Sequence, residues 1–234
     1  MVPLKKALNS SLGRKYLMSV SGLAMVGFIV THLLGNLQLY GDGTAFNAYA
    51  KGLHDLGPLL WALELGLIGI FLLHVAVALG LQVSNRKAAG PVRYQAAQRS
   101  KGGPSYFSVF SRGMIFTGGI LFVFIVTHVL HFKYGVFSPA EIANKTTTVN
   151  GEQATDLYAR VVHAFKNPGW VAFYMFCMGV VFAHLRHGFW SAFQSIGALN
   201  WRLEKPATLA AIVVAAALSA GFLGIPVYIF LTNL

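Results

Sequence analysis

The sequence predicts an all-α membrane protein with five transmembrane helices. Its 234 residues are 56% hydrophobic and only 11% charged, and the mean hydropathy of +0.60 is typical of a membrane protein rather than of a soluble core. Five apolar runs are each long enough to cross a bilayer, which takes about 20 residues. The pentapeptide Phe-Ile-Val-Thr-His occurs twice, at residues 28–32 in the first run and at residues 124–128 in the third.

We expect one transmembrane domain, residues 1–234, with helices at 16–38, 58–82, 113–134, 168–192 and 206–230. Pro58 and Pro168 open the second and fourth helices, because proline is tolerated in the first turn of a helix. Two connecting segments each contain a short amphipathic stretch, at residues 44–54 with Thr44 as the N-cap, and at residues 155–163.

Lysine and arginine residues predict the orientation of the chain. The N-terminal tail, residues 83–112 and residues 186–205 hold 13 of the 18, whereas the two other connecting segments hold five, which five acidic residues balance. Positive charge concentrates on the cytoplasmic side of membrane proteins. We therefore expect a cytoplasmic N-terminus and a basic cytoplasmic face, which attracts anionic lipid and suits an acidic soluble partner.

An internal duplication relates the first two helices to the third and fourth. A hydroxyl residue and a glycine precede each copy of the repeated histidine by eleven and ten residues, as Ser21-Gly22 and Thr117-Gly118. Sixteen residues separate the opening proline from a histidine in both the second and the fourth helix. Residues 12–82 and 108–192 are therefore predicted to be two parallel repeats, with equivalent residues at equal depth, and the fifth helix is an addition.

Four intramembrane histidines fall into two layers. From a rise of about 1.5 Å per residue, His32 and His128 lie ~22–24 Å from the cytoplasmic ends of their helices, and His74 and His184 lie ~12 Å from theirs. Two imidazoles on facing helices are a good pair of axial ligands for haem iron. We therefore expect a duplicated bundle that holds two b haems about 10–12 Å apart in depth, with each Nδ1–H donating to a carbonyl one turn back.

Other roles for these histidines compete with haem ligation. A single histidine in a membrane helix is more often a satisfied polar contact, but four histidines, one per helix and ordered by a duplication, are hard to explain in that way. His131 and His187, each three residues after a predicted ligand, are rival ligands. The single cysteine, Cys177, excludes a protein-ligated iron–sulfur cluster within the chain, and no Cys-x-x-Cys-His motif is present for covalent haem attachment.

Several short motifs, taken together, match a known family. The chain resembles the five-helix, di-haem cytochrome b membrane anchor of succinate:quinone oxidoreductases, a family that includes quinol:fumarate reductases. The resemblance covers the first four helices and their outer loops, and more loosely the fifth helix. The order and spacing of five pieces carry it: His32; Ala45-Phe46-Asn47; Ala62-Leu63-Glu64 with His74; Thr117-Gly118 with His128; and His184 with Gly188-Phe189-Trp190-Ser191.

The resemblance implies that His74 and His184 hold a proximal haem b near the cytoplasmic partner, and that His32 and His128 hold a distal haem b. It also implies a flavoprotein subunit and an iron–sulfur subunit, at which succinate is oxidised or fumarate reduced, and menaquinone or menaquinol as the membrane substrate. The chain is then an electron-transfer subunit of the bacterial inner membrane, in contact with lipid and quinone but with no nucleic acid. A higher oligomer of the complex is compatible with this assignment.

Some fumarate-reducing members of the family carry a glutamate two residues before the histidine of the fourth helix. This chain has Phe182 at that position, so that a proton path through it is not expected. Glu64 is instead the only carboxylate inside a predicted span, about 10 Å from the outer end of its helix. It is the candidate proton relay at the quinone site, with a hydrogen bond to a neighbour as the alternative role.

Further polar residues are candidates for supporting roles. His54 and His163, at the outer surface, are candidates to pass protons onward. Candidate contacts for the propionates of the proximal haem lie near the cytoplasmic face: Ser19, Ser21, Ser111 and, as the best of these, Arg112.

Two other functions stay open at the level of sequence. Another transmembrane di-haem cytochrome, such as the ascorbate-reducible kind or the anchor of a hydrogenase or formate dehydrogenase, also places histidines on several helices. A proton-coupled transporter built from repeats predicts broken helices and more polar residues at the repeat interface. The predicted spans contain few polar residues of that kind, which favours electron transfer.

Overall fold

The structure, a computed structural model, describes residues 3–88 and 108–233, apart from the side chains of residues 4, 5, 9, 88 and 108–112. Its five long helices are α2 (Ser11–Asn36), α4 (Pro58–Ala88), α5 (Ser108–His128), α8 (Pro168–Ser195) and α9 (Glu204–Thr232). By length and composition, all five are apolar enough and long enough to cross a membrane. They confirm the five predicted helices, and each extends beyond its predicted bounds at one end or both.

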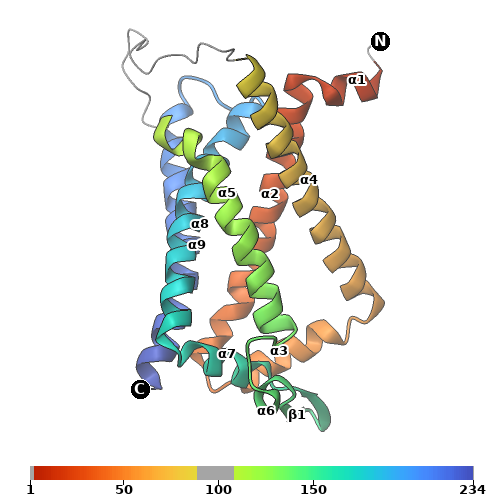
Figure 1. Cartoon of the computed structure of the whole chain (residues 1–234), viewed down its shortest axis with the longest axis vertical. Coiled ribbons are helices and arrows are strands. Elements are labelled where there is room, and N and C mark those ends of the chain that lie inside the picture. Colours follow the sequence, from red (N-terminus) through yellow and green to blue (C-terminus); the bar gives the residue numbers. More distant parts are fainter. Residues whose placement is uncertain (1–2, 89–107, 234) are drawn as a thin grey trace.

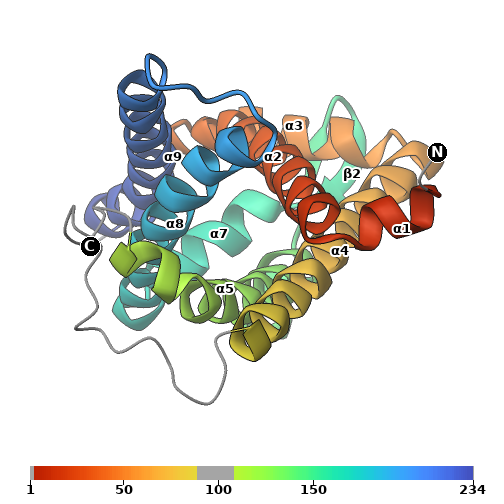
Figure 2. The same ribbon diagram turned by 90° about the horizontal axis from the view of Figure 1, so that it is seen from above.

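Four of the long helices form a ring. α2 packs against α4 and α8, and α5 packs against the same two helices, so that the four surround the middle of the bundle when seen from above (Figure 2). The short helix α1 (Leu4–Asn9) lies at one end, called the tail end here (Figure 1). At the opposite end, called the capped end, α2 continues into the 3-10 turn η1 (Leu37–Tyr40) and α5 into the π-helical turn η2 (Val129–Lys133).

The fifth long helix, α9, lies outside the ring, against α8 and α2 (Figure 2). Small residues let it approach α2 closely. A Cβ built at Gly221 would lie 2.7 Å from the side chain of Leu33, and one at Gly224 would lie 2.5 Å from the hydroxyl of Tyr40. Close approach at small residues is a common way for helices to pack in membranes.

A cap layer closes the capped end (Figure 1). It consists of α3 (Thr44–His54), α6 (Ala140–Ala143), an antiparallel hairpin of β1 (Thr146–Val149) and β2 (Glu152–Thr155), and α7 (Leu157–Phe165). The two predicted amphipathic helices are thus confirmed. The hairpin is not among the predicted elements, although the Asn150-Gly151 pair at its turn is a strong sequence signal for one.

The predicted N-cap of α3 is wrong. Gly43, with a φ of 87°, precedes the helix, and Thr44 is its first residue. The side chain of Asp42 accepts the hydrogen bond from the backbone N–H of Thr44 at 3.0 Å. The Asp42 carboxylate therefore accepts a hydrogen bond from the start of the helix, the role that was predicted for the Thr44 hydroxyl. Gly43 turns the chain sharply between these two residues and so allows the contact.

Two polar residues join α3 to α7 within the cap layer. The Asn47 side chain donates to Asp156 Oδ1 at 2.9 Å and accepts from the backbone N–H of Tyr158 at 3.0 Å. Asp156 also caps α7 by accepting from the backbone N–H of Ala159 at 3.0 Å. Burial raises the pKa of the Asp156 carboxyl, but these hydrogen bonds and nearby Lys145 outweigh burial and hold that pKa below its usual range. A hydrophobic core lies beneath, where α3, α7, α8 and α9 meet.

Candidate functional site

Each helix of the ring carries one of the four predicted ligand histidines. These are His32 on α2, His74 on α4, His128 at the end of α5 and His184 on α8. They form two pairs at two levels of the bundle. His32 and His128 lie near the capped end and are called the cap-side pair. His74 and His184 lie nearer the middle and are called the tail-side pair.

Both histidines of the tail-side pair contact a hydroxyl group on a neighbouring helix. Ser21 Oγ on α2 lies 3.1 Å from His74 Nδ1, and Thr117 Oγ1 on α5 lies 3.0 Å from His184 Nδ1. Ser21 and Thr117 are equivalent positions of the two predicted repeats, and the two histidines are equivalent as well. The same interhelical contact is thus made twice, once in each repeat.

The hydroxyl contacts suit one tautomer of each imidazole. The Ser21 hydroxyl lies 2.7 Å from the carbonyl oxygen of Leu17, and the Thr117 hydroxyl lies 3.2 Å from that of Met114, so that each can donate its single hydrogen to its own helix. A hydroxyl oxygen that donates in this way accepts from a histidine Nδ1–H. In that tautomer Nε2 is unprotonated, which is the form that binds a metal. The predicted partner of Nδ1, a carbonyl one turn back, is wrong for this pair, because the neighbouring helix brings a hydroxyl to it.

A glycine beside each hydroxyl residue lets the imidazole lie against the helix backbone. A Cβ built at Gly22 would lie 3.4 Å from Cε1 of His74, and one at Gly118 would lie 3.6 Å from Cε1 of His184. A lone Cβ would already be in van der Waals contact, so that a longer side chain pointing the same way would collide with the imidazole. The contact gives a physical reason for the glycine that follows the hydroxyl residue in both repeats.

The hydroxyl contacts also measure the separation between the two levels. Ser21 is level with His74, and His32 lies eleven residues further along the same helix. His128 lies eleven residues beyond Thr117 in the same way. Eleven residues of helix rise about 16 Å along the helix axis. The separation in depth, predicted as about 10–12 Å, stays a prediction.

The rings of the cap-side pair lie close together. The centroids of His32 and His128 are 5.8 Å apart, with an angle of 86° between the ring planes. Two imidazoles bound to opposite sides of one metal ion, with bonds of about 2 Å, have centroids about 6 Å apart. The observed spacing is close to that value.

Helix α9 contributes to the surroundings of His32. The imidazole stacks on Phe28 at a centroid distance of 5.3 Å and lies 5.7 Å from the ring of Phe222 on α9. Asn36, one turn further on, places its Nδ2 3.4 Å from His32 Nδ1. The sequence assigned no role to α9, and the structure gives it the role of covering this histidine.

His128 is enclosed mainly by aromatic rings. Phe124 and Phe132, one turn away on either side, and Tyr174 on α8 lie 5.3–6.1 Å from its imidazole. Its Nδ1 is buried and has no hydrogen-bond partner among the described residues. A buried polar atom without a partner is costly, and it is common at sites that hold a ligand.

The two pairs have the number of side chains that a haem would take, because a haem iron needs only two protein ligands and the porphyrin supplies the other four. The ring centroids of His32 and His128 are 5.8 Å apart, and the Nδ1 of His74 and that of His184 each meet a hydroxyl group. Within the described residues, no group of three or more His, Cys, Asp and Glu side chains gathers for a metal ion.

The rival ligands have other surroundings. His131 is fully buried in an aromatic cluster at the capped end, with its ring 4.3 Å from that of Trp170 and its Nδ1 3.4 Å from the hydroxyl of Tyr174. His187 is half-buried on α8, one turn beyond His184. His131 is therefore a member of that cluster rather than of the cap-side pair.

Glu64 has a charged partner. Its carboxylate forms an ion pair with Lys133 Nζ at 2.5 Å, and both side chains are partly exposed. The pair joins α4 to the end of η2. The alternative role, a bond to a neighbour, is thus observed, and the proton relay stays a prediction.

The other predicted supporting residues fall in different places. Ser19 is buried and its hydroxyl donates to its own helix, at the carbonyl of Lys15. His54 is exposed at the end of α3, and His163 is half-buried on α7.

Arg112 and Ser111 belong to α5, but their side chains lie outside the described residues. The propionate contact predicted for Ser21 stays a prediction, beside its observed contact with His74.

Arg160 is a buried residue to which the sequence analysis assigned no role. Its guanidinium donates to the carbonyls of Phe132 at 2.6 Å and Lys133 at 3.1 Å, which end η2, and to the carbonyl of Ala143. Burial lowers the pKa of Arg160. A cation that binds the last carbonyls of a helix is favoured by the helix dipole. Arg160 thereby holds the end of α5, and with it His128, against the cap layer.

Comparisons with protein-family models, with curated proteins and with solved structures give no match. The arguments that follow therefore rest on the residues of this chain.

Proposed function

We propose that this chain is the membrane-anchoring cytochrome b subunit of a succinate dehydrogenase or fumarate reductase. The observation that carries the proposal is the repeated contact of a helix hydroxyl with the Nδ1 of His74 and of His184, which suits the tautomer in which Nε2 binds a metal. A second pair of histidines, His32 and His128, about 16 Å further along the bundle, supplies ligands for a second haem.

Two b haems supply one-electron carriers at two depths of the membrane. The chain's own residues do the rest of the work. Ser21 and Thr117 orient the imidazoles of the tail-side pair. Phe28 and Phe222 cover the ring of His32, which keeps water from it. Outer partners of this kind tune ligand strength and hence reduction potential.

The proposed orientation places the N-terminus in the cytoplasm of a bacterium, with the chain in the inner membrane. The concentration of lysine and arginine in the N-terminal tail, residues 83–112 and residues 186–205 supports it. A flavoprotein and an iron–sulfur subunit would dock on this basic side, near the tail-side pair. Electrons would pass between them and menaquinone through the two haems, and the chain alone would not act on succinate or fumarate.

The experiment that tests the ligands is a pyridine haemochrome assay of the purified protein and of two variants, His32→Ala and His74→Ala. We expect two b haems per chain in the parent protein and one in each variant, and a redox titration of the native proteins should show that a different haem is lost in each. His54→Ala is the matched control, because His54 is an exposed histidine of the cap layer. A parent protein without haem, or variants that lose the same haem, would contradict the proposal.

The partner proteins need a separate experiment. In native membranes, succinate should reduce the haems of this chain, because the partner subunits feed electrons into the tail-side pair. Reduction by hydrogen or formate, with no response to succinate, would instead assign the chain to another di-haem oxidoreductase.

A further inference from the structure

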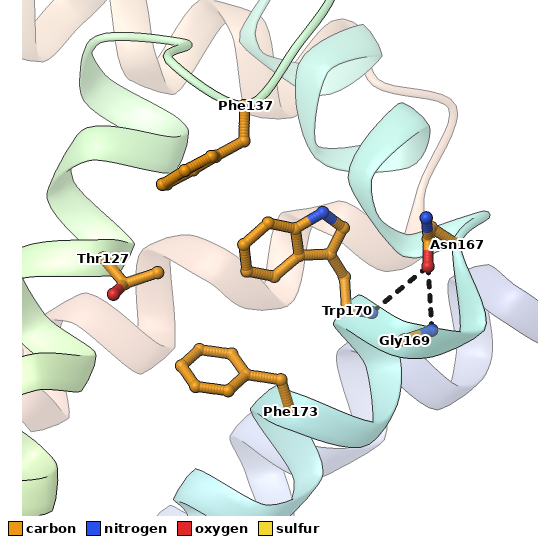
Figure 3. A pocket seen from close by; sticks show the side chains of 6 residues that line it. All are labelled: Thr127, Phe137, Asn167, Gly169, Trp170 and Phe173. Carbon is orange, nitrogen blue, oxygen red and sulfur yellow. Dashed lines mark hydrogen bonds between the residues drawn. The ribbon is translucent and has the colours of Figure 1, made fainter.

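An aromatic pocket of about 540 Å³ opens between α5 and the start of α8 near the capped end (Figure 3). The rings of Phe137, Trp170 and Phe173 lie one above another along one side, with neighbouring centroids 5.2 and 5.8 Å apart, and Thr127 lies opposite on α5. Asn167 closes the pocket at the N-terminus of α8, where its Oδ1 accepts from the backbone N–H of Gly169 at 2.8 Å. The pocket is therefore mainly aromatic, with Thr127 and Asn167 as its polar side chains.

An apolar groove of about 440 Å³ continues from this pocket along α5. The two share Phe173, and the remaining groove residues are Ile115, Phe116, Gly119, Ile120 and Val123. Thr127 and Phe116 are eleven residues apart, so that pocket and groove together run about 16 Å along the helix toward the tail end. Their combined shape suits a molecule with a flat ring and a long apolar tail.

His131 supplies polar chemistry behind the aromatic wall. It lies one turn after Thr127, and its ring contacts two of the aromatic residues that line the pocket, Trp170 at 4.3 Å and Phe137 at 5.6 Å. The side chain is fully buried, its Nδ1 faces the Tyr174 hydroxyl at 3.4 Å, and its Nε2 has no hydrogen-bond partner among the described residues. Such an atom marks a place where a ligand or a proton is accommodated.

We propose that this pocket binds the ring of the membrane quinone, a 1,4-naphthoquinone, and that the groove binds its isoprenoid tail. The proposal rests on the proposed function. The methyl group of Thr127 faces the aromatic rings in Figure 3, and a rotation about χ1 brings its hydroxyl to the pocket as the donor for a quinone carbonyl. The rings of Phe137, Trp170 and Phe173 form the wall beside the quinone ring. An amphiphile held in this way enters from the lipid side, with its tail in the membrane and its ring near the capped surface.

The pocket lies next to the cap-side pair. Thr127 precedes His128 in the chain, and Phe173 contacts Phe124 at 6.2 Å, which in turn contacts His128 at 5.7 Å. Oxidation of a bound hydroquinone to the quinone would release two protons and two electrons, for which two ferric haems would be the acceptors. His131 and Tyr174 lie beside Trp170 of the aromatic wall and can carry those protons. Glu64 lies on α4, on another side of α5, and does not line this pocket.

Photolabelling tests the location of the site. The probe is an azido-1,4-naphthoquinone with an isoprenoid tail, applied to the purified full chain in lipid nanodiscs. We expect label on peptides from residues 113–137 and 168–176, and competition by unlabelled menaquinone. Label on α4 around Glu64, or displacement of the probe by phospholipid but not by menaquinone, would overturn the assignment and leave the groove as a lipid contact.

Variants test the two parts of the site separately. In Thr127→Val, reduction of the haems by 2,3-dimethyl-1,4-naphthoquinol should slow about tenfold, which is the usual effect of losing one hydrogen bond to a ligand. Gly119→Leu should slow only quinols with a long tail, because it fills the groove. Trp61→Leu, an exposed tryptophan on α4, is the control. Equal rates in all variants would overturn the proposal.

A haem count and full reduction by dithionite in each variant test the proposed function, a di-haem cytochrome b, independently of the quinone site. A chain without haem contradicts the proposed function, while the photolabelling still reports whether the pocket takes a naphthoquinone. A chain with both haems and label elsewhere contradicts only the quinone site.

Discussion

The two histidine pairs occupy one four-helix ring but are held in different ways. In the tail-side pair, each histidine contacts a hydroxyl of a neighbouring helix, and the two repeats make the same contact. In the cap-side pair, His32 has Phe28, Asn36 and the ring of Phe222 from α9 around it. His128 instead lies among aromatic residues of α5, η2 and α8.

From this contrast we infer that a sequence duplication specifies only the contacts made within one repeat. Each hydroxyl–histidine contact of the tail-side pair joins two helices of one predicted repeat, and the other predicted repeat makes the same contact. The cap-side pair joins the two predicted repeats. Phe28 and Phe124 of the repeated pentapeptide lie beside its two histidines in the same way, but Phe222 of α9 lies beside His32, and Arg160 binds the carbonyls that follow His128. We therefore expect the two pairs to respond differently to the same kind of change.

The largest expected effect comes from Arg160→Ala. The change leaves three carbonyls at the end of η2 and in α6 without their donor, and each buried unsatisfied group costs about 1–3 kcal/mol. We expect a lower melting temperature and loss of the cap-side haem, with the tail-side haem retained. The haemochrome assay counts the haems, a redox titration compared with that of His32→Ala shows which haem is lost, and the melting temperature reports stability.

Lys51→Ala is the matched control for that change. Lys51 is equivalent to Arg160, because Tyr49-Ala50-Lys51 of the first predicted repeat matches Tyr158-Ala159-Arg160 of the second. Lys51 forms ion pairs with Asp55 and Glu152, each at 2.6 Å, in place of carbonyl contacts. Its removal should leave both haems bound. Loss of both haems together in Arg160→Ala would show that the two pairs are not independent.

A smaller effect is expected at the tail-side pair from Ser21→Ala and Thr117→Ala. Each change removes the acceptor of an Nδ1–H, a hydrogen bond worth about 0.5–1.5 kcal/mol. The imidazole then donates less to the iron and stabilises the ferric state less. The reduction potential of the tail-side haem should rise by about 20–60 mV, while that of the cap-side haem stays unchanged, as measured by redox titration.

Thr117→Ser keeps the hydroxyl and is the control for that prediction. A potential that moves as far in Thr117→Ser as in Thr117→Ala would assign the effect to packing. Equal shifts of both haems would remove the distinction between the pairs.

The smallest effect on stability is expected from Glu64→Gln. The ion pair of Glu64 with Lys133 is partly exposed, and such pairs contribute about 0–1 kcal/mol. Haem content should be unchanged. If Glu64 relays protons at the cap side, reduction of the haems by quinol slows in this variant but remains complete with dithionite. Lys133→Gln breaks the same ion pair and keeps the carboxylate, so that equal slowing in both variants would assign the effect to the ion pair.

Much of the fold was predictable, because long apolar runs have few other ways to satisfy their backbone in a membrane. The order of the two histidine levels was also predictable, since the duplication aligns Ser21 with Thr117 and His74 with His184. The distance between the levels depends on which residues of two helices lie side by side, and a count from helix ends does not measure that.

The polar partners of the site were mostly beyond prediction. Lys51 and Arg160 are equivalent in the repeats, yet one forms exposed ion pairs and the other is buried against three carbonyls. Among the features that were not predicted, the β1–β2 hairpin had a local sequence signal, the Asn150-Gly151 pair at its turn.

The sequence by itself determined the five apolar helices, the duplication and the placing of one histidine on each helix of the ring. Tertiary structure alone decided which atoms meet: the hydroxyl of Ser21 with His74, the ring of Phe222 with His32, and the ion pair of Glu64 with Lys133. The physical reason is the distance along the chain over which each kind of interaction acts. Hydropathy and helix periodicity act along the chain within a few residues, whereas ligand geometry is set by side chains from helices that are far apart in sequence.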